Sequence, residues 1–282
     1  MDIQETQYQS WDLQEKDLDK LKTLLENSGK YEALEMKDAL KSGFEGWWNG
    51  TFHNDQIVCV AYITKQFVYL YGREREPMLS LGKSLARSQG KRSGGSTHSI
   101  FGPNDMVMAF WQGFQMTDKT VLTDVKLNLC ELTQIACKLN DAYEVRQAVK
   151  KDLPLVFDFY GEALIDELGM DVRKLSKDAH EKNCAQLISE GAFYLGYHRG
   201  KPAFIAKVRE SDIGIFLDNA HFPVAMRRPK VMRGIHARLA EKLLAENSSV
   251  LLYVKDTDQE TQAALDEVGY RVVLPSRLMR LR

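Results

Sequence analysis

The feature that most constrains this fold is an order of elements that occurs once in each half of the chain. In the first half, hydrophobic periodicity predicts two amphipathic helices, then three strands, a helix, a strand, a helix and a strand. The second half has two helix candidates and then the same order, and in both halves a short turn joins two strands into a hairpin. A chain of 282 residues also exceeds the usual domain size of roughly 100 to 200 residues. We therefore expect two α/β domains.

The expected elements follow from these patterns. In the first half we expect helices at residues 16–27, 31–41, 78–87 and 105–114, and strands after the glycines of 43–50 and at 56–63, 66–71, 98–101 and 121–132. In the second half we expect helices at 152–168, 179–189, 235–245 and 261–268, and strands at 192–198, 202–209, 213–224, 250–254 and 269–273. The polar stretch 133–151, expected to be partly helical, is limited by Pro154 and is the expected boundary. It separates domains at residues 1–135 and 150–282.

Composition and charge exclude several classes of protein. A net charge of -1 gives no overall basic field that would attract nucleic acid or an acidic membrane surface. The four cysteines do not have the paired spacing of a metal site, so no bound metal is expected. The polar N-terminus and the lack of a long apolar run predict neither a targeting segment nor a membrane span. We expect a cytoplasmic protein with no membrane partner.

One segment of the second half has the pattern of an anion site. After the strand expected to end at Val224, a basic loop with a glycine, Gly234, leads into a helix. Such a helix start offers unpaired N–H groups and a positive dipole end to a phosphate. Arg227, Arg228 and Lys230 add positive charge to this loop.

In this setting the second half resembles the GNAT superfamily of CoA-dependent N-acyltransferases. The match keeps its register from Val224 to His236 and again from Leu252 through the pair Gly269-Tyr270. The resemblance implies two tandem GNAT-like α/β (α+β) domains, each a mixed, mostly antiparallel sheet flanked by helices, with acetyl-CoA or another acyl-CoA bound by the second. The residues that it implies for binding are Val224, Ala225 and Met226 beside the pantetheine arm, Met232, Arg233, Gly234, Ile235 and His236 under the diphosphate, and Asp258, where an asparagine is usual.

The chain also departs from the family's pattern. His236 replaces a small residue of the loop, and Val231 replaces an arginine or glutamine. Leu265 and Ala220 occupy the positions of the usual tyrosine acid and glutamate base. In the first half, residues 72–76 lack the loop pattern, so the resemblance implies a degenerate N-terminal domain.

Two residues are candidates for the missing base. Asp218 lies two residues from Ala220 and is expected to share its face on an extended strand, which would direct its carboxylate at an amine. His221 is the second candidate, because a histidine ordinarily titrates near neutral pH, although a single histidine is often structural. Two classes of function stay open: an N-acyltransferase, with acetyl transfer to a small-molecule or protein amine as the expected reaction, and a non-catalytic acyl-CoA-binding or protein-interaction module.

Overall fold

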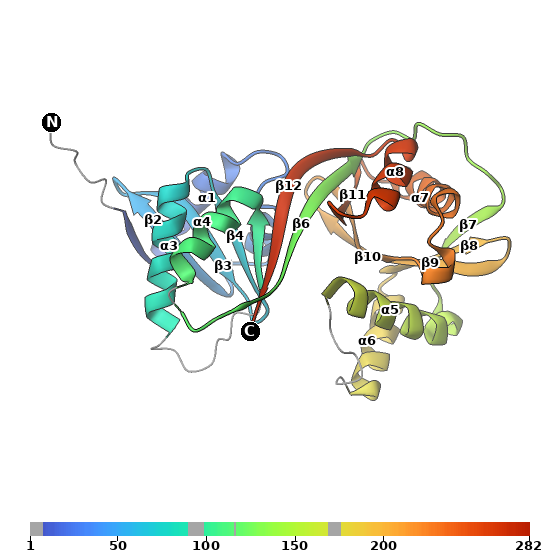
Figure 1. Ribbon diagram of the computed structural model, residues 1–282, viewed down its shortest axis with the longest axis horizontal. Helices are drawn as coiled ribbons and strands as arrows, with labels where there is room; N and C mark the ends of the chain where they lie inside the picture. The colour runs from blue at the N-terminus through green and yellow to red at the C-terminus, as the bar shows by residue number, and fades with distance from the viewer. Residues whose placement is uncertain (1–7, 90–98, 116, 169–175) are drawn as a thin grey trace. The chain divides into compact units, whose positions relative to one another are not determined.

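The computed structural model describes residues 8–89, 99–115, 117–168 and 176–282 (Figure 1). The chain forms two compact units: an N-terminal unit of Met1–Asn128 with Leu274–Arg282, and a C-terminal unit of Leu129–Val273. These units differ from the expected ranges 1–135 and 150–282 in two places. The last residues of the chain belong to the N-terminal unit, and the stretch expected to separate two domains is part of the C-terminal unit.

The N-terminal unit is a mixed sheet with helices on both faces. Its elements are β1 (Gln9–Asp12), the 3-10 turn η1 (Glu15–Asp17), α1 (Leu18–Glu26), α2 (Leu34–Lys41), β2 (Trp47–His53), β3 (Gln56–Ile63), β4 (Phe67–Gly72), α3 (Arg75–Gln89), β5 (Ser99–Pro103), α4 (Asn104–Phe114) and β6 (Val121–Leu132). Strands β1 to β4 are antiparallel neighbours, and β4 pairs in parallel with β5. Apolar side chains of α3 and α4 form one core with the sheet, and those of α1 and α2 form another.

The C-terminal unit has the same plan. Its elements are β7 (Tyr143–Gln147), the 3-10 turn η2 (Lys150–Asp152), α5 (Leu153–Leu168), α6 (Lys177–Ser189), β8 (Phe193–His198), β9 (Lys201–Ser211), β10 (Gly214–His221), the 3-10 turn η4 (Val224–Met226), α7 (Pro229–Leu244), β11 (Val250–Lys255) and α8 (Gln259–Val268). The last strand, β12 (Arg271–Leu281), begins in this unit, and its residues from Leu274 onward belong to the N-terminal unit. Strands β7 to β10 are antiparallel neighbours, and β10 pairs in parallel with β11. Figure 1 shows α5 and α6 on one face of this sheet and α7 and α8 on the other.

The two units exchange their sixth strands. In the sheet, β12 lies next to β5, and β6 lies next to β11. The residues of β12 that pair with β5, from Ser276 to Arg280, come from the C-terminal end of the chain. Met279 in this segment and Leu281 just after it are buried in the core of the N-terminal unit. The strand that completes the first unit therefore lies at the C-terminal end of the chain, after the whole second unit in sequence.

The expected fold class, a mixed sheet flanked by helices, is confirmed, with local corrections to several elements. The edge strands β1 and β7 lie where no strand was expected, and β7 replaces part of the helical boundary 133–151. Both strands are short, so their alternation of apolar and polar residues gives a weak signal. The strand expected over 213–224 ends at His221. No helix in the described ranges is long and apolar enough to cross a membrane.

Candidate active site at the split between two strands

The parallel strands β10 and β11 pair only where they begin. In their described register Ile215 pairs with Val250, and Phe216 pairs with Leu251. Beyond these two pairs β10 continues to His221 and β11 continues to Lys255. Because backbone groups of a strand edge form hydrogen bonds with any extended chain that offers amides, this split suits an extended, amide-containing ligand.

A bulge in β10 sets which side chains face each side of the split. Asn219 has a φ of 53°, and the pairing of β10 with β9 shifts between Asp218 and His221. The inserted residue reverses the alternation of faces, so Ala220 packs toward the core beneath α7 and His221 turns toward α5. The expectation that Asp218 shares a face with Ala220 is wrong for this reason.

A cavity of about 150 Å³ lies at the split. Its lining comes from both faces of the sheet, because it includes side chains that contact α5 and side chains of the core beneath α7. The lining residues are Asp166, Ala220, His221, Phe222, Arg227, Met232, His236, Leu252, Tyr253, Val254, Lys255, Asp258 and Thr261.

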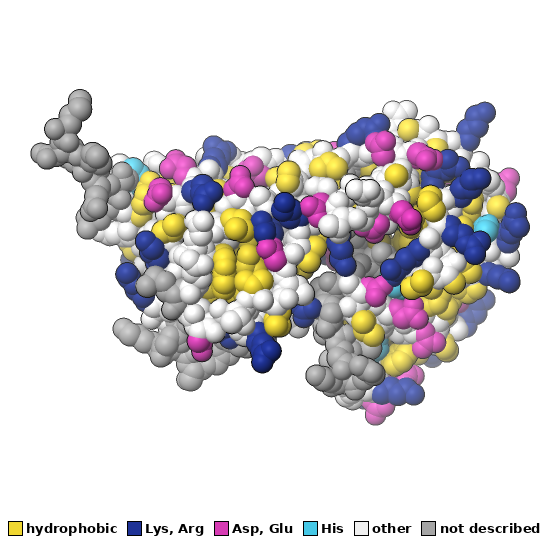
Figure 2. Space-filling model, in the orientation of Figure 1, with side chains coloured by type: hydrophobic (Ala, Val, Ile, Leu, Met, Phe, Trp, Pro, Cys, Tyr) yellow, Lys and Arg dark blue, Asp and Glu magenta, His cyan; other side chains and the backbone are white. Residues whose placement is uncertain are grey.

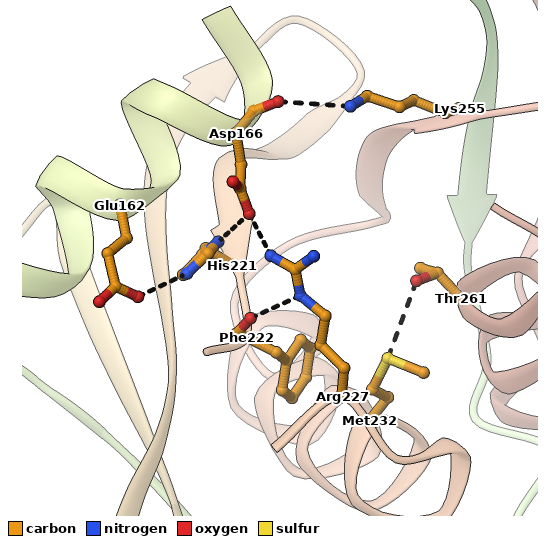
Figure 3. Close-up of polar contacts among 8 residues, drawn as sticks. All are labelled: Glu162, Asp166, His221, Phe222, Arg227, Met232, Lys255 and Thr261. Carbon is orange, nitrogen blue, oxygen red and sulfur yellow. Dashed lines mark hydrogen bonds and ion pairs between the residues drawn. The ribbon is translucent and has the colours of Figure 1, made fainter. Parts of the chain in front are cut away.

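His221 lies between two carboxylates of α5 on one side of the cavity (Figure 3). Its Nε2 is 3.2 Å from Oε2 of Glu162, and its Nδ1 is 3.5 Å from Oδ2 of Asp166. The guanidinium of Arg227 pairs with Asp166 and donates from Nε to the carbonyl of Phe222 at 2.8 Å. These contacts hold the imidazole in one orientation at the end of β10.

Burial controls the charge of His221. Removal of the ring from water lowers its pKa, while the hydrogen bond to Glu162 acts in the opposite direction. A lowered pKa keeps the imidazole neutral at physiological pH, with one N–H and one lone pair. A neutral, oriented imidazole is a suitable general base.

The carboxylates around His221 were not found from the sequence. Glu162 and Asp166 lie one helical turn apart on α5, and their side chains are 55% and 43% exposed. On the face drawn in Figure 2, acidic side chains lie over α5. Their spacing of four residues indicates a shared helix face, but nothing local connects this face to a histidine more than fifty positions later.

Asp218, the other expected base, lies outside the cavity. Its Oδ2 accepts a hydrogen bond from Nε of Arg209 at 3.1 Å. The guanidinium of Arg209 also lies over the ring of Phe216, at 4.4 Å from its centroid. Asp218 therefore belongs to a cross-strand ion pair.

The start of α7 differs from the expected phosphate cradle. Val224, Ala225 and Met226 form a 3-10 turn after the strand, and Val224 is 79% exposed. Because α7 already begins at Pro229, the N–H groups from Met232 to His236 lie inside the helix, where they bond to the preceding turn. The N–H of Met232, for example, bonds to the carbonyl of Arg228 at 2.9 Å. The expectation that these groups are available to a diphosphate is wrong.

The other residues of the expected cradle have structural contacts. A Cβ on Gly234 would overlap the ring of Tyr143, so this glycine permits the close packing of α7 on β7. Ile235 is fully buried in the core, and Arg233 pairs with Glu267 of α8. A bulky side chain at position 234 would therefore disturb packing rather than a phosphate contact.

Two expected positions on α8 are also structural. Asp258 caps α8 by accepting a hydrogen bond from the N–H of Thr261 at 3.1 Å, and it lines the cavity as well. Leu265 is buried in the core beneath α7 and α8. An apolar side chain at this position is consistent with its burial, and it supplies no proton donor.

His236 lies on the other side of the cavity from His221. It is 1% exposed, and its ring lies among those of Phe204, Phe222 and Tyr270, with centroid distances of 5.4, 5.5 and 6.2 Å. Neither ring nitrogen has a hydrogen-bond partner within the described parts of the chain, and Nδ1 is sealed from solvent. Burial lowers its pKa to about 4, so the ring is neutral.

Comparisons with known proteins show where this fold occurs. No family model matches the sequence, and no curated protein matches it. A GCN5-related N-acetyltransferase from Sphaerobacter thermophilus is similar in structure, with a TM-score of 0.66, 11% identity and coverage of 97% of this chain and 95% of that chain. A GNAT-family acetyltransferase from Colwellia psychrerythraea has a TM-score of 0.59 and 12% identity over 97% of this chain and 100% of that chain.

A third similar structure is a tandem GNAT protein from the clavulanic acid biosynthesis pathway. Its TM-score is 0.55 and its identity is 9%, over 97% of this chain and 98% of that chain. Identities this low are informative about the arrangement of the backbone alone. Together with the strand order common to both units, these likenesses show that the chain has the fold of the GNAT superfamily.

Proposed function

We propose that the C-terminal unit transfers an acyl group from a thioester, carried on the pantetheine arm of an acyl-CoA, to an amine. The observation that supports this most strongly is the cavity at the split between β10 and β11, with the neutral, oriented imidazole of His221 in its wall. A reaction of this kind depends on holding the thioester in place and removing a proton from the amine.

The residues fit the two ends of acyl-CoA unequally. The unpaired parts of β10 and β11 suit the amides of the pantetheine arm. The diphosphate finds few backbone donors, because the N–H groups of Met226, Arg227, Arg228, Val231 and Met232 bond to nearby carbonyls and Pro229 has none. Bound acyl-CoA would supply the acyl group as a thioester, with its phosphates near the exposed Arg228 and Lys230.

In this proposal His221 takes the proton that the amine loses as it attacks. The exposed carboxylates of Glu162 and Asp166 attract a positively charged amine to that side of the cavity. They also stabilise the imidazolium after the transfer, while Arg227 holds Asp166 in place. Water supplies the proton for the departing thiolate, since Leu265 offers none.

A pair of variants tests the proposal. Thiol release from acetyl-CoA would be measured with a panel of primary amines that includes a lysine peptide, alongside acetyl-CoA binding by calorimetry. His221→Gln keeps a hydrogen-bonding side chain but cannot accept the proton, so we expect turnover to fall by roughly 10²- to 10⁴-fold with binding retained. Asp218→Asn is the matched control, because its carboxylate lies outside the cavity, and we expect turnover within about threefold of wild type.

The outcomes separate the two classes of function. Unchanged turnover in His221→Gln would reject this base. Binding of acetyl-CoA without thiol release from any amine would favour a non-catalytic thioester-binding module. An absence of binding at millimolar acetyl-CoA would reject the thioester site itself.

A further inference from the structure

The unpartnered histidine in the cavity wall is the starting point. His236 is almost fully buried, yet neither of its nitrogens forms a hydrogen bond within the described residues. Because Nδ1 is sealed from solvent, Nε2 is the nitrogen that a ligand or water in the cavity can reach, and buried polar side chains nearly always have such a partner. The hydroxyl of Tyr270, whose ring is 6.2 Å away, is a second buried group in this region without a partner.

Packing alone does not explain His236. The surrounding rings of Phe204 and Phe222 would accept a phenylalanine of the same shape, which leaves no nitrogen unpaired. His236 also lines the cavity together with apolar side chains such as Met232 and Leu252. The lining also includes charged and polar side chains, among them His221, Arg227 and Asp258. A pocket that combines apolar side chains with a few polar groups is the usual form of a small-molecule site.

The surroundings also indicate the chemistry of the occupant. A cavity of about 150 Å³ is small beside the roughly 300 to 1,000 Å³ of a usual ligand pocket, so it suits a short group. His236 is neutral and packed among aromatic rings, so it offers no opposite charge to a carboxylate or an ammonium group. A hydroxyl group can donate to or accept from a neutral imidazole in either tautomer.

We propose that the cavity selects a short acyl group that carries a hydroxyl substituent, and that His236 is the hydrogen-bond partner of this hydroxyl. The inference rests on the proposed thioester site and specifies its acyl group. Met232 and Leu252 contact the carbon chain, and His236 distinguishes the hydroxylated chain from the plain one. In this role His236 determines specificity on the core side of the sheet, while His221 acts on the α5 side.

A matched pair of ligands tests this inference. Binding of 3-hydroxybutyryl-CoA and of butyryl-CoA would be measured by calorimetry on the full chain, without an acceptor amine. We expect wild type to prefer the hydroxylated ligand by about tenfold, the effect of one net hydrogen bond. His236→Phe keeps an aromatic ring among its neighbours but removes the nitrogens, so we expect it to prefer butyryl-CoA.

A control variant and the possible outcomes complete the test. Ile235→Val alters the same helix core next to His236 but outside the cavity, and should keep the wild-type preference. Equal binding of both ligands by wild type, or a preference that persists in His236→Phe, would overturn the inference and leave the thioester site standing. Failure of both ligands to bind would overturn the site and the inference together.

Discussion

At the scale of single residues, His236 makes the stability of the C-terminal unit depend on pH. Its pKa is about 4 in the folded chain, against an ordinary value of 6.5. Below pH 6.5 the unfolded chain therefore binds a proton that the folded chain does not, and stability falls until the pH reaches about 4. The cost is about 1 kcal/mol at pH 5.5 and about 3 kcal/mol below pH 4.

We expect the His236→Phe variant to lack the loss of stability that His236 causes between pH 6.5 and about 4. We also expect it to be more stable than wild type at every pH. The measurement is hydrogen exchange of the α7 amides, corrected for intrinsic rates, because tryptophan fluorescence reports only on the N-terminal unit. All four tryptophans belong to that unit: Trp11, Trp47, Trp48 and Trp111. Other ionisable side chains, among them His221, Asp166 and Asp258, line the cavity in both proteins, so the difference between the proteins is the relevant quantity. A difference that stays constant from pH 7.5 to 5 would contradict the buried, neutral state of His236.

The sequence indicated which residue types could take part in the site, but not which way their side chains point. His221 was a candidate from its titration range, and the structure gives it a place in the cavity wall. Asp218 was favoured by strict alternation, which the bulge at Asn219 breaks. Gly234 matched the glycine of a phosphate loop, whereas in the structure the ring of Tyr143 occupies the space that a Cβ at this position would fill. A bulge and a helix-to-strand contact depend on tertiary structure, so neither leaves a local signal.

At the scale of elements, the start of α7 predicts how the acyl donor is recognised. Recognition should rest on the pantetheine arm, because the first turn begins with Pro229 and most of the nearby N–H groups are already bonded. We expect acetyl-CoA to bind no more than about tenfold more tightly than S-acetyl-pantetheine, because exposed Arg228 and Lys230 contribute only weak, screened contacts. Calorimetry at 50 and 300 mM salt checks this, and the small advantage should shrink at the higher salt.

A double variant provides the control for this prediction. Replacing Arg228 and Lys230 with alanine should make the two thioesters bind equally, while His236→Phe should leave their ratio unchanged. An advantage of acetyl-CoA of a thousandfold or more that persists at high salt would contradict the prediction, since it would require a buried anion site.

Elements with long periodic patterns were predictable from the sequence, and short or exchanged ones were not. The helical periodicity that leads to α4 and α7 and the alternation that leads to β6 are local properties. The four- and five-residue edge strands β1 and β7 acquire their structure from one neighbour each. The pairing of β12 with β5 joins residues about 175 positions apart, and no local pattern records it.

At the scale of the whole molecule, the two units share a strand order but differ in how their corresponding helices pack. In the N-terminal unit a Cβ on Gly82 or Gly113 would overlap backbone atoms of the facing helix, so α3 and α4 pack closely together. In the C-terminal unit the corresponding helices α7 and α8 meet through longer side chains, including the pair Arg233 and Glu267. The two units therefore differ in the packing of these helices, although they share a strand order.

The exchanged strand leads to a prediction about truncation. Ending the chain at Val273 removes the residues that pair with β5 and the buried side chains of Met279 and Leu281. Loss of each such side chain costs about 2 to 5 kcal/mol, so the pair approaches the whole stability of a domain, which is about 5 to 15 kcal/mol. We expect the N-terminal unit to lose its cooperative unfolding transition, measured by tryptophan fluorescence in urea.

The C-terminal unit should keep most of its protection in the same truncated chain, because all but the first residues of β12 belong to the other unit. Hydrogen exchange of α7 and β9 measures this separately from the fluorescence. In the full-length chain, Met279→Ala with Leu281→Ala should lower the urea midpoint of the N-terminal unit, whereas Met279→Leu should change it little, since that substitution nearly conserves volume. A truncated chain with a wild-type fluorescence transition would show that β12 is dispensable, and would contradict the exchange of strands as the basis of this unit's stability.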